Sequence, residues 1–200
     1  MLFHSKAKYS GYFDSNGIPM LNYHGTIGLQ YNPIAISQWG LGNYNLWRKT
    51  KDIDSYDKFI KSADWLVDNI KKNKYGVDVW FHEFDFEYRD KLKSPWYSGL
   101  AQGQAISVLV RAFIETGKSS YKITAQKAIG SFNIDVSKGG VNFCDKNGYN
   151  WIEEYIVFPP THILNGFIWA LWGIFDYAIV FDSKKYKKKF YNYSNTLINN

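Results

Sequence analysis

The sequence predicts a mainly α-helical protein in which paired helices, joined by short connections, carry short β-hairpins at one end. Apolar residues recur every three or four positions over most of the chain, as they do on the buried face of a helix. Two stretches between helices instead show a period of two or a strong turn signal, which indicates hairpins. No linker, repeat or low-complexity tract divides the 200 residues, so they read as one domain or as part of one.

The N-terminal segment, residues 1–27, is rich in aromatic residues and glycine but has no clear period, and we expect irregular structure or edge strands there. It contains no apolar run of the kind that forms a secretory signal, which favours a cytoplasmic location. Residues 28–200 hold the predicted helices and form the main domain.

The helices of this domain are predicted from their apolar stripes and from the residues that can begin or end them. Pro33 suits the first position of a helix. Asp54 or Ser55 can cap the next helix, whose apolar residues form one stripe. A third helix is expected over residues 97–116 and ends at Gly117. Further helices are expected over residues 120–132, after Thr161 and over the lysine-rich residues 184–189.

The apolar run over residues 163–181, which is followed by lysines, resembles a membrane span in its length and its flank. Asn165 and Asp176 lie within it, and both side chains are costly in a bilayer. We therefore expect a buried helix and no membrane span. The lysines that follow are expected to form a solvated helix face.

Two stretches between the helices are predicted to form hairpins. In the first, acidic residues alternate with aromatic ones from Glu83 to Tyr88, a period that is typical of a strand. Its three carboxylates would lie along one solvated face, where they seldom converge on a single ion, and we predict no metal site. In the second, residues 145–148 (Asp-Lys-Asn-Gly) are a turn signal between segments that contain Phe143 and Trp151.

Composition limits the partners that we consider. The net charge is +6, the sequence pI is near 9.1, and 19% of the residues are aromatic. This mixture suits an anionic partner with flat, amphipathic faces, either a nucleic acid or an acidic polysaccharide. The basic and aromatic residues form no recognisable nucleic-acid-binding module, so we favour the polysaccharide. With Cys144 as the single cysteine, no internal disulfide and no cysteine-based metal cage can form.

Glu153, Glu154 and Tyr155 leave the second predicted hairpin just before the apolar helix. A phenol has a pKa near 10, so it acts as a base only where a cation or a hydrogen bond stabilises its phenolate. On its own, the triplet is also consistent with solvated acids and a packed ring. We recognise no glycine-rich phosphate loop and no serine or cysteine triad, and we expect no cofactor.

Several blocks of sequence occur in a family-specific order. They are residues 31–44 (beginning Tyr-Asn-Pro-Ile-Ala-Ile), 62–69 (Ser-Ala-Asp-Trp-Leu-Val), 94–107 (Ser-Pro-Trp-Tyr-Ser-Gly-Leu-Ala-Gln-Gly-Gln-Ala-Ile-Ser), 151–155 (Trp-Ile-Glu-Glu-Tyr) and 164–167 (Leu-Asn-Gly-Phe). Together they resemble the D-glucuronyl C5-epimerases, over roughly residues 28–177. The resemblance implies a catalytic domain that is an (α/α) helical barrel. It also implies conversion of D-glucuronate to L-iduronate within heparan-type polysaccharides, without a redox cofactor.

The resemblance also implies roles for individual residues. Tyr155 would be a catalytic acid or base, and Glu154 would position it or share its protons. Gln102 or Gln104 could instead bond to buried backbone, and Arg111 could instead hold a structural carboxylate. The expected substrate contacts are Tyr31, Gln38, Tyr44, Tyr97, Gln104, Arg111 and Asn165.

The chain departs from the family pattern at its C-terminal end. The family continues to an Arg-Trp-Asp-Tyr stretch with further catalytic tyrosines and an arginine that binds the carboxylate, which is not found before Asn200. We therefore expect a truncated, incomplete barrel. A second copy of the chain or a different chain would complete it. A non-catalytic glycan-binding protein, half of a split enzyme and a polysaccharide lyase are alternatives, since a lyase removes the same C5 proton.

Overall fold

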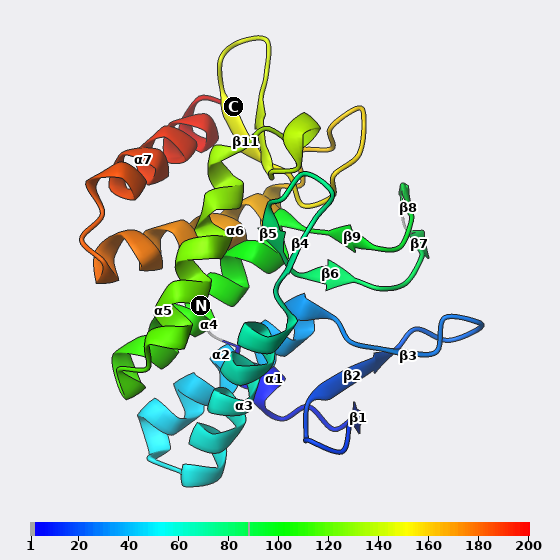
Figure 1. Cartoon of the computed structure of the whole chain (residues 1–200), viewed down its shortest axis with the longest axis vertical. Coiled ribbons are helices and arrows are strands. Elements are labelled where there is room, and N and C mark those ends of the chain that lie inside the picture. The colour runs from blue at the N-terminus through cyan, green and yellow to red at the C-terminus, as the bar shows by residue number, and fades with distance from the viewer. Residues whose placement is uncertain (1–2, 88) are drawn as a thin grey trace.

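The computed structural model describes residues 3–87 and 89–200. The main helices pair as α2 (Pro33–Thr50) with α3 (Ile53–Asn69), α4 (Gly99–Thr116) with α5 (Ser119–Ala128), and α6 (Leu164–Val180) with α7 (Lys184–Asn199). A short helix, α1 (His4–Ala7), packs on α2. Because α4 packs against both α2 and α6, the first helices of the pairs lie side by side (Figure 1). This is a partial (α/α) helical barrel, as expected.

The ends of α2 and α4 mostly follow the predicted signals. The side chain of Asn32 accepts hydrogen bonds from the first turn of α2, and Pro33 is the first residue of that helix. α4 ends at Gly117, which has the left-handed conformation that favours glycine. The predicted start of α4 is too early, because Tyr97 belongs to a strand and Ser98 is the residue that caps the helix.

Two other helix predictions need correction. Asp52, rather than Asp54 or Ser55, caps α3, because its carboxylate accepts both the backbone N–H and the hydroxyl of Ser55. The helix predicted over residues 120–132 is divided: α5 is followed by a 3-10 helix, η1 (Ile129–Asn133). Such a tighter turn is common at the end of an α-helix.

Short antiparallel strands complete the fold. The pairs are β1 (Tyr12–Phe13) with β2 (Pro19–Asn22), β2 with β3 (Leu29–Gln30), β4 (Lys71–Lys72) with β5 (Asp78–Val79), β6 (Phe81–His82) with β9 (Trp96–Tyr97), β7 (Phe86–Glu87) with β8 (Lys91–Leu92), and β10 (Asn142–Cys144) with β11 (Asn150–Ile152). A second 3-10 helix, η2, spans Val136–Lys138. Strands β6 to β9 extend away from the helices on one side (Figure 1). The division of the chain at residue 28 stays a prediction.

The first predicted hairpin is less regular than its alternation suggests. Pairing is interrupted between β6 and β7, where the side chain of Asp85 accepts the backbone N–H of Ser94. The alternation persists in burial, since Phe84 is buried while Glu83 and Asp85 are exposed. Tyr88, the end of the predicted strand, lies outside the described residues. Within the described residues, no three side chains of metal-binding type gather at one place.

The second predicted hairpin, β10–β11, is confirmed. The Asp145 carboxylate accepts the backbone N–H groups of Asn147 at 2.8 Å and Tyr149 at 3.0 Å. Gly148 takes a φ of +84°, which a residue with a side chain rarely adopts. The turn therefore fixes the register that brings Trp151 opposite Phe143.

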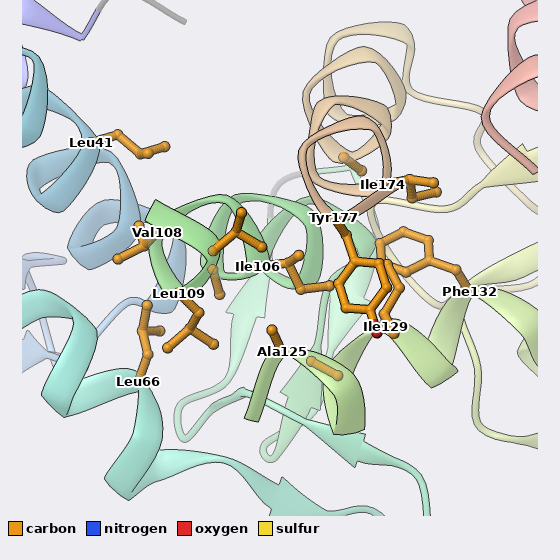
Figure 2. Packing of buried hydrophobic residues seen from close by; sticks show 14 of the residues in the cluster. Leu41, Leu66, Ile106, Val108, Leu109, Ala125, Ile129, Phe132, Ile174 and Tyr177 are labelled. Atoms are coloured by element: carbon orange, nitrogen blue, oxygen red, sulfur yellow. The ribbon is translucent and has the colours of Figure 1, made fainter. Parts of the chain in front are cut away.

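The hydrophobic core lies around α4. Figure 2 shows Ile106 and Leu109 of α4 between Leu66 of α3 on one side and Ile174 of α6 on the other. All four side chains are fully buried. Burial of such side chains stabilises a fold by about 1.5–3 kcal/mol each, so α4 is the element on which the others depend.

The apolar run predicted as a buried helix forms α6, which lies against α4 with almost no space between the backbones. A Cβ at Gly103 would lie 2.4 Å from the Cα of Ala170, and a Cβ at Gly173 would lie 2.1 Å from the carbonyl oxygen of Gly103. Asp176 of α6 is paired with Arg111 of α4. Among the described residues, no helix combines the length and apolar character needed to span a bilayer.

Candidate functional site

The starts of α4 and α6 both lie against the segment that follows β11. The backbone N–H of Gly99 donates to the carbonyl of Glu153 at 3.0 Å, and a Cβ at Gly99 would lie 2.4 Å from that oxygen. In the first turn of α6, a Cβ at Gly166 would lie 2.1 Å from Glu154 Oε2. The two glycines therefore allow the helices to hold this segment between them, and α4 and α6 run in the same direction away from it.

Glu154 and Tyr155 form the centre of the candidate site. The Glu154 residue is only 7% exposed, and this burial raises the pKa of its carboxyl, whereas a hydrogen bond with the Tyr155 side chain lowers it. Glu154 Oε2 has no hydrogen-bond partner among the described residues. The half-buried Tyr155 ring packs edge-on against Trp96, with ring centroids 5.9 Å apart. A carboxylate with a raised pKa, in contact with a phenol, is a suitable partner for proton exchange.

Glu153 holds the loop that carries Tyr155, a role that the sequence does not reveal. Glu153 is 1% exposed, and its Oε2 accepts hydrogen bonds from the backbone N–H groups of Thr161 and His162, each at 3.2 Å. Oε1 lies 2.6 Å from Nδ1 of His162, whose ring stacks on Trp151. The carboxylate thus joins the two ends of the loop between β11 and α6. These partners lie eight or nine residues apart along an irregular loop, where no periodic pattern indicates contact.

A hollow of about 500 Å³, which we call the lysine hollow, has a lining that includes Ile156, the next residue in the chain after Tyr155, and Trp96, on which Tyr155 packs. Trp96 and Tyr97 form part of its wall, together with Ile156. Its cations are Lys74, Lys91 and Lys93. Lys93 is paired with Asp85 at 2.5 Å, but both side chains are exposed, so a charged ligand can displace the carboxylate at little cost. The lysine hollow offers aromatic faces and mobile positive charges, which together suit an anionic sugar.

His82 supports the wall of the lysine hollow from behind. Its ring is fully buried and stacks flat on Trp96, with ring centroids 3.7 Å apart and an interplanar angle of 3°. Burial lowers the pKa of His82 to about 3, so the ring is neutral near pH 7. Trp96 therefore rests on an uncharged ring, and it also contacts the rings of Phe84, Phe86 and Tyr155.

Two of the predicted substrate contacts lie near the Glu154–Tyr155 pair. Tyr97 lines the lysine hollow, and burial raises the pKa of its phenol to about 12, so that it keeps its proton. Asn165 is exposed in the first turn of α6, next to Gly166, which touches Glu154. The structure thus brings these two residues to the same end of the helices as the pair.

Tyr44 and Arg111 lie at the opposite end of α4, about 18 Å along the helix from Gly99. The hydroxyl of Tyr44 donates to Glu115 at 2.9 Å. Arg111 forms two hydrogen bonds with Asp176, at 2.5 and 3.3 Å. Both polar groups are therefore occupied within the protein, and the structure does not bring them to the lysine hollow.

The two predicted glutamines are buried among the helices. Gln38 is 6% exposed, and Gln104 is fully buried with no hydrogen-bond partner for its amide among the described residues. The backbone-bonding role that we considered for Gln102 or Gln104 belongs to Gln102, which accepts from Trp80 N and donates to the Asp78 carbonyl, both at 3.1 Å. Neither predicted glutamine lines the lysine hollow.

Comparison with known proteins adds to this geometry. Residues 71–200 match the family described as D-glucuronyl C5-epimerase C-terminus. A D-glucuronyl C5-epimerase of Caenorhabditis elegans is 39% identical over 118 residues, which are 59% of this chain and 19% of that protein. An uncharacterized protein of Methanocaldococcus jannaschii is 28% identical over 179 residues, covering 79% of this chain and 58% of that protein. The chain therefore spans less than two thirds of either relative.

A solved structure is similar in fold. It is a crystal structure of a family 76 glycoside hydrolase from a bovine Bacteroides thetaiotaomicron strain, with a TM-score of 0.57 and 13% sequence identity. The match covers 82% of this chain and 33% of the other. At this level of identity the likeness concerns the arrangement of the helices alone.

Proposed function

Because the chain belongs to the D-glucuronyl C5-epimerase family, through that family's C-terminal domain, we propose that it inverts C5 of D-glucuronate within a heparan- or heparosan-type polysaccharide. The product would be L-iduronate. The observation that carries this proposal is the contact of buried Glu154 with half-buried Tyr155, whose ring packs on the Trp96 wall of the lysine hollow.

The reaction breaks the C5–H bond of the uronate. The electron pair of that bond moves into the adjacent carboxylate and forms an enediolate with one additional negative charge, which needs cations or hydrogen-bond donors nearby. Tyr155 takes the C5 proton once its own proton has passed to Glu154, whose raised pKa makes the carboxylate a better acceptor than an exposed glutamate. Glu153 keeps Tyr155 in place by fastening its loop.

The lining of the lysine hollow supplies the charges that this step requires. Lys74, Lys91 and Lys93 can move toward the sugar carboxylate, since their side chains project into solvent at the rim. Tyr97 remains protonated, and its hydroxyl can exchange the long hydrogen bond that it donates to the Gly140 carbonyl, at 3.5 Å, for one to the substrate. Inversion also requires a proton donor on the opposite face of the sugar, because one fixed group cannot serve both faces.

The experiment is incubation of the purified chain with heparosan in deuterated water. Deuterium at uronate C5 and the iduronate fraction are measured by NMR and mass spectrometry. Deuterium together with iduronate supports the proposal in full. Deuterium without iduronate means that proton removal occurs but that the opposite face lacks a donor.

Other outcomes identify the alternatives. New ultraviolet absorbance from an unsaturated sugar would identify a lyase, in which loss of the C4 substituent follows proton removal. Retention on a heparosan column without deuterium exchange would identify a glycan-binding protein. Exchange that survives Tyr155→Phe would remove Tyr155 from the mechanism.

A further inference from the structure

A second hollow lies on the surface of α3 and shares no lining residue with the lysine hollow. Its volume is about 380 Å³, which is within the range of small-molecule sites. We call it the α3 hollow. Its lining comes from α3 and from residues that precede α2, and includes Asp14, Tyr31, Asp64, Trp65, Asp68 and Asn69.

Two aromatic rings form one wall of the α3 hollow. Tyr31 packs against Trp65 with ring centroids 5.7 Å apart, and 37% of Tyr31 remains exposed. The Tyr31 hydroxyl donates to Asp14 Oδ2 at 2.7 Å, while Asp14 Oδ1 accepts the backbone N–H of Ile18 at 2.8 Å. The ring is therefore fixed before any ligand arrives. Amphipathic rings held in this way suit the apolar faces of a sugar ring.

The polar groups of the α3 hollow are mainly hydrogen-bond acceptors. Asp64 Oδ1 accepts a hydrogen bond from the hydroxyl of Tyr121 at 2.6 Å, and this bond does not involve Asp64 Oδ2. Asp68 is exposed, and the single lysine of this lining is Lys61. Carboxylates accept hydrogen bonds from sugar hydroxyls, whereas they repel a sulfate or a uronate. The charge of the α3 hollow is thus opposite to that of the lysine hollow.

A small hollow of about 70 Å³ has lining residues in common with each of these two larger hollows. It shares Tyr31, Trp65 and Asn69 with the α3 hollow, and it shares Phe81 with the lysine hollow. The three hollows therefore follow one another along the surface, with an aromatic residue at each junction. Such a path suits an extended chain molecule better than a single compact ligand.

We infer that the α3 hollow is a distal subsite, which binds a neutral hexosamine of the polysaccharide while a uronate of the same chain lies in the lysine hollow. A polymer that alternates neutral and acidic sugars matches the change of charge along the path. The identity of the polymer rests on the proposed function. The α3 hollow then selects against N-sulfated hexosamine, because the carboxylates of its lining repel an added sulfate group.

The test measures the affinity of heparosan oligosaccharides by calorimetry. Tyr31→Ala should weaken binding of a decasaccharide about tenfold, the effect of losing one well-packed aromatic contact, and should leave binding of a disaccharide unchanged. Tyr31→Phe keeps the ring and should retain most of the affinity. Asp68→Asn should raise the affinity for an N-sulfated decasaccharide about two- to fivefold, as expected for removal of one exposed like charge. Asp57→Asn, an exposed change on the same helix but outside the α3 hollow, is the matched control.

The outcomes separate this inference from the proposed function. Equal affinity of wild type and Tyr31→Ala for the decasaccharide overturns the subsite, even if deuterium exchange at C5 is normal. Failure of the wild type to bind the decasaccharide, or tighter binding of the N-sulfated form, also overturns it. Binding that depends on chain length and on Tyr31, without deuterium exchange, supports the subsite and contradicts the proposed function instead.

Discussion

Replacement of Gly166 by alanine tests whether the position of the Glu154 carboxylate controls proton transfer. A Cβ at residue 166 would lie 2.1 Å from Glu154 Oε2, and the oxygen would have to move by about 1.3 Å to reach the 3.4 Å of an ordinary contact. A displacement of about 1 Å in a catalytic group costs about a hundredfold in rate. We therefore expect Gly166→Ala to slow deuterium exchange at uronate C5 about a hundredfold.

The new methyl group would also lie 2.8 Å from Glu154 Cβ, so the backbone at Glu154 must shift by about 0.6 Å to reach the same 3.4 Å contact. Alanine is also the better helix former by about 1 kcal/mol, which offsets part of the rearrangement. Gly130→Ala is the matched control, since no atom lies within 4 Å of a Cβ at that position. Exchange rates are compared after circular dichroism has shown equal helix content and similar melting temperatures.

A double variant shows whether the effect acts through Glu154. In a Glu154→Gly background, Gly166→Ala should cause no further loss, because every side-chain atom with which the methyl group collides is absent. A folded Gly166→Ala protein that exchanges at the wild-type rate would refute the reasoning. So would an equal further loss in the Glu154→Gly background, since the collision would then involve another group.

Three further predictions concern residues around and away from the site. Tyr155→Phe should abolish deuterium exchange without lowering the melting temperature, whereas Tyr149→Phe on the neighbouring hairpin should leave exchange intact. His82 has its pKa lowered from 6.5 to about 3 in the folded chain, so the unfolded chain binds more protons between these values and stability falls as pH drops through them. Urea unfolding from pH 7 to 3 should show a smaller loss for His82→Phe than for wild type. Arg111→Leu should lower the free energy of unfolding by about 2–3 kcal/mol, because it leaves the half-buried Asp176 unpaired; loss of polymer affinity with unchanged stability would instead show that Arg111 binds substrate.

Helices were the most predictable part of the fold, because their signals are local. The Asn32-Pro33 start of α2 and the Gly117 end of α4 need only a few neighbouring residues to be recognised. The predicted start of α4 is too early because Tyr97 pairs with Phe81 across β9 and β6. Local sequence does not indicate this long-range strand pairing. The sequence does not single out Asp52 as the cap of α3, because Asp52, Asp54 and Ser55 are all residue types that cap helices.

The candidate site was predictable only in part. The resemblance picks out Glu154 and Tyr155, but the lysine hollow combines side chains from separate hairpins that no spacing connects. Arg111 illustrates the opposite case: its partner Asp176 lies 65 residues away, so the sequence leaves its role open between substrate and structure. Buried polar pairs of this kind are set by packing between helices, which local patterns do not encode.

The glycine contact between α4 and α6 lies close to the site end of α4, and this has a mechanical consequence. Gly103 is about 6 Å along the helix from Gly99 but about 20 Å from Thr116. The contact therefore acts as a pivot with a short arm toward the site. Splaying the helices by about 5° moves the far end by almost 2 Å and the site end by only about 0.5 Å, given the rise of a helix per residue. Thermal motion and substitutions at the far end are in this way attenuated before they reach Tyr97 and Glu154.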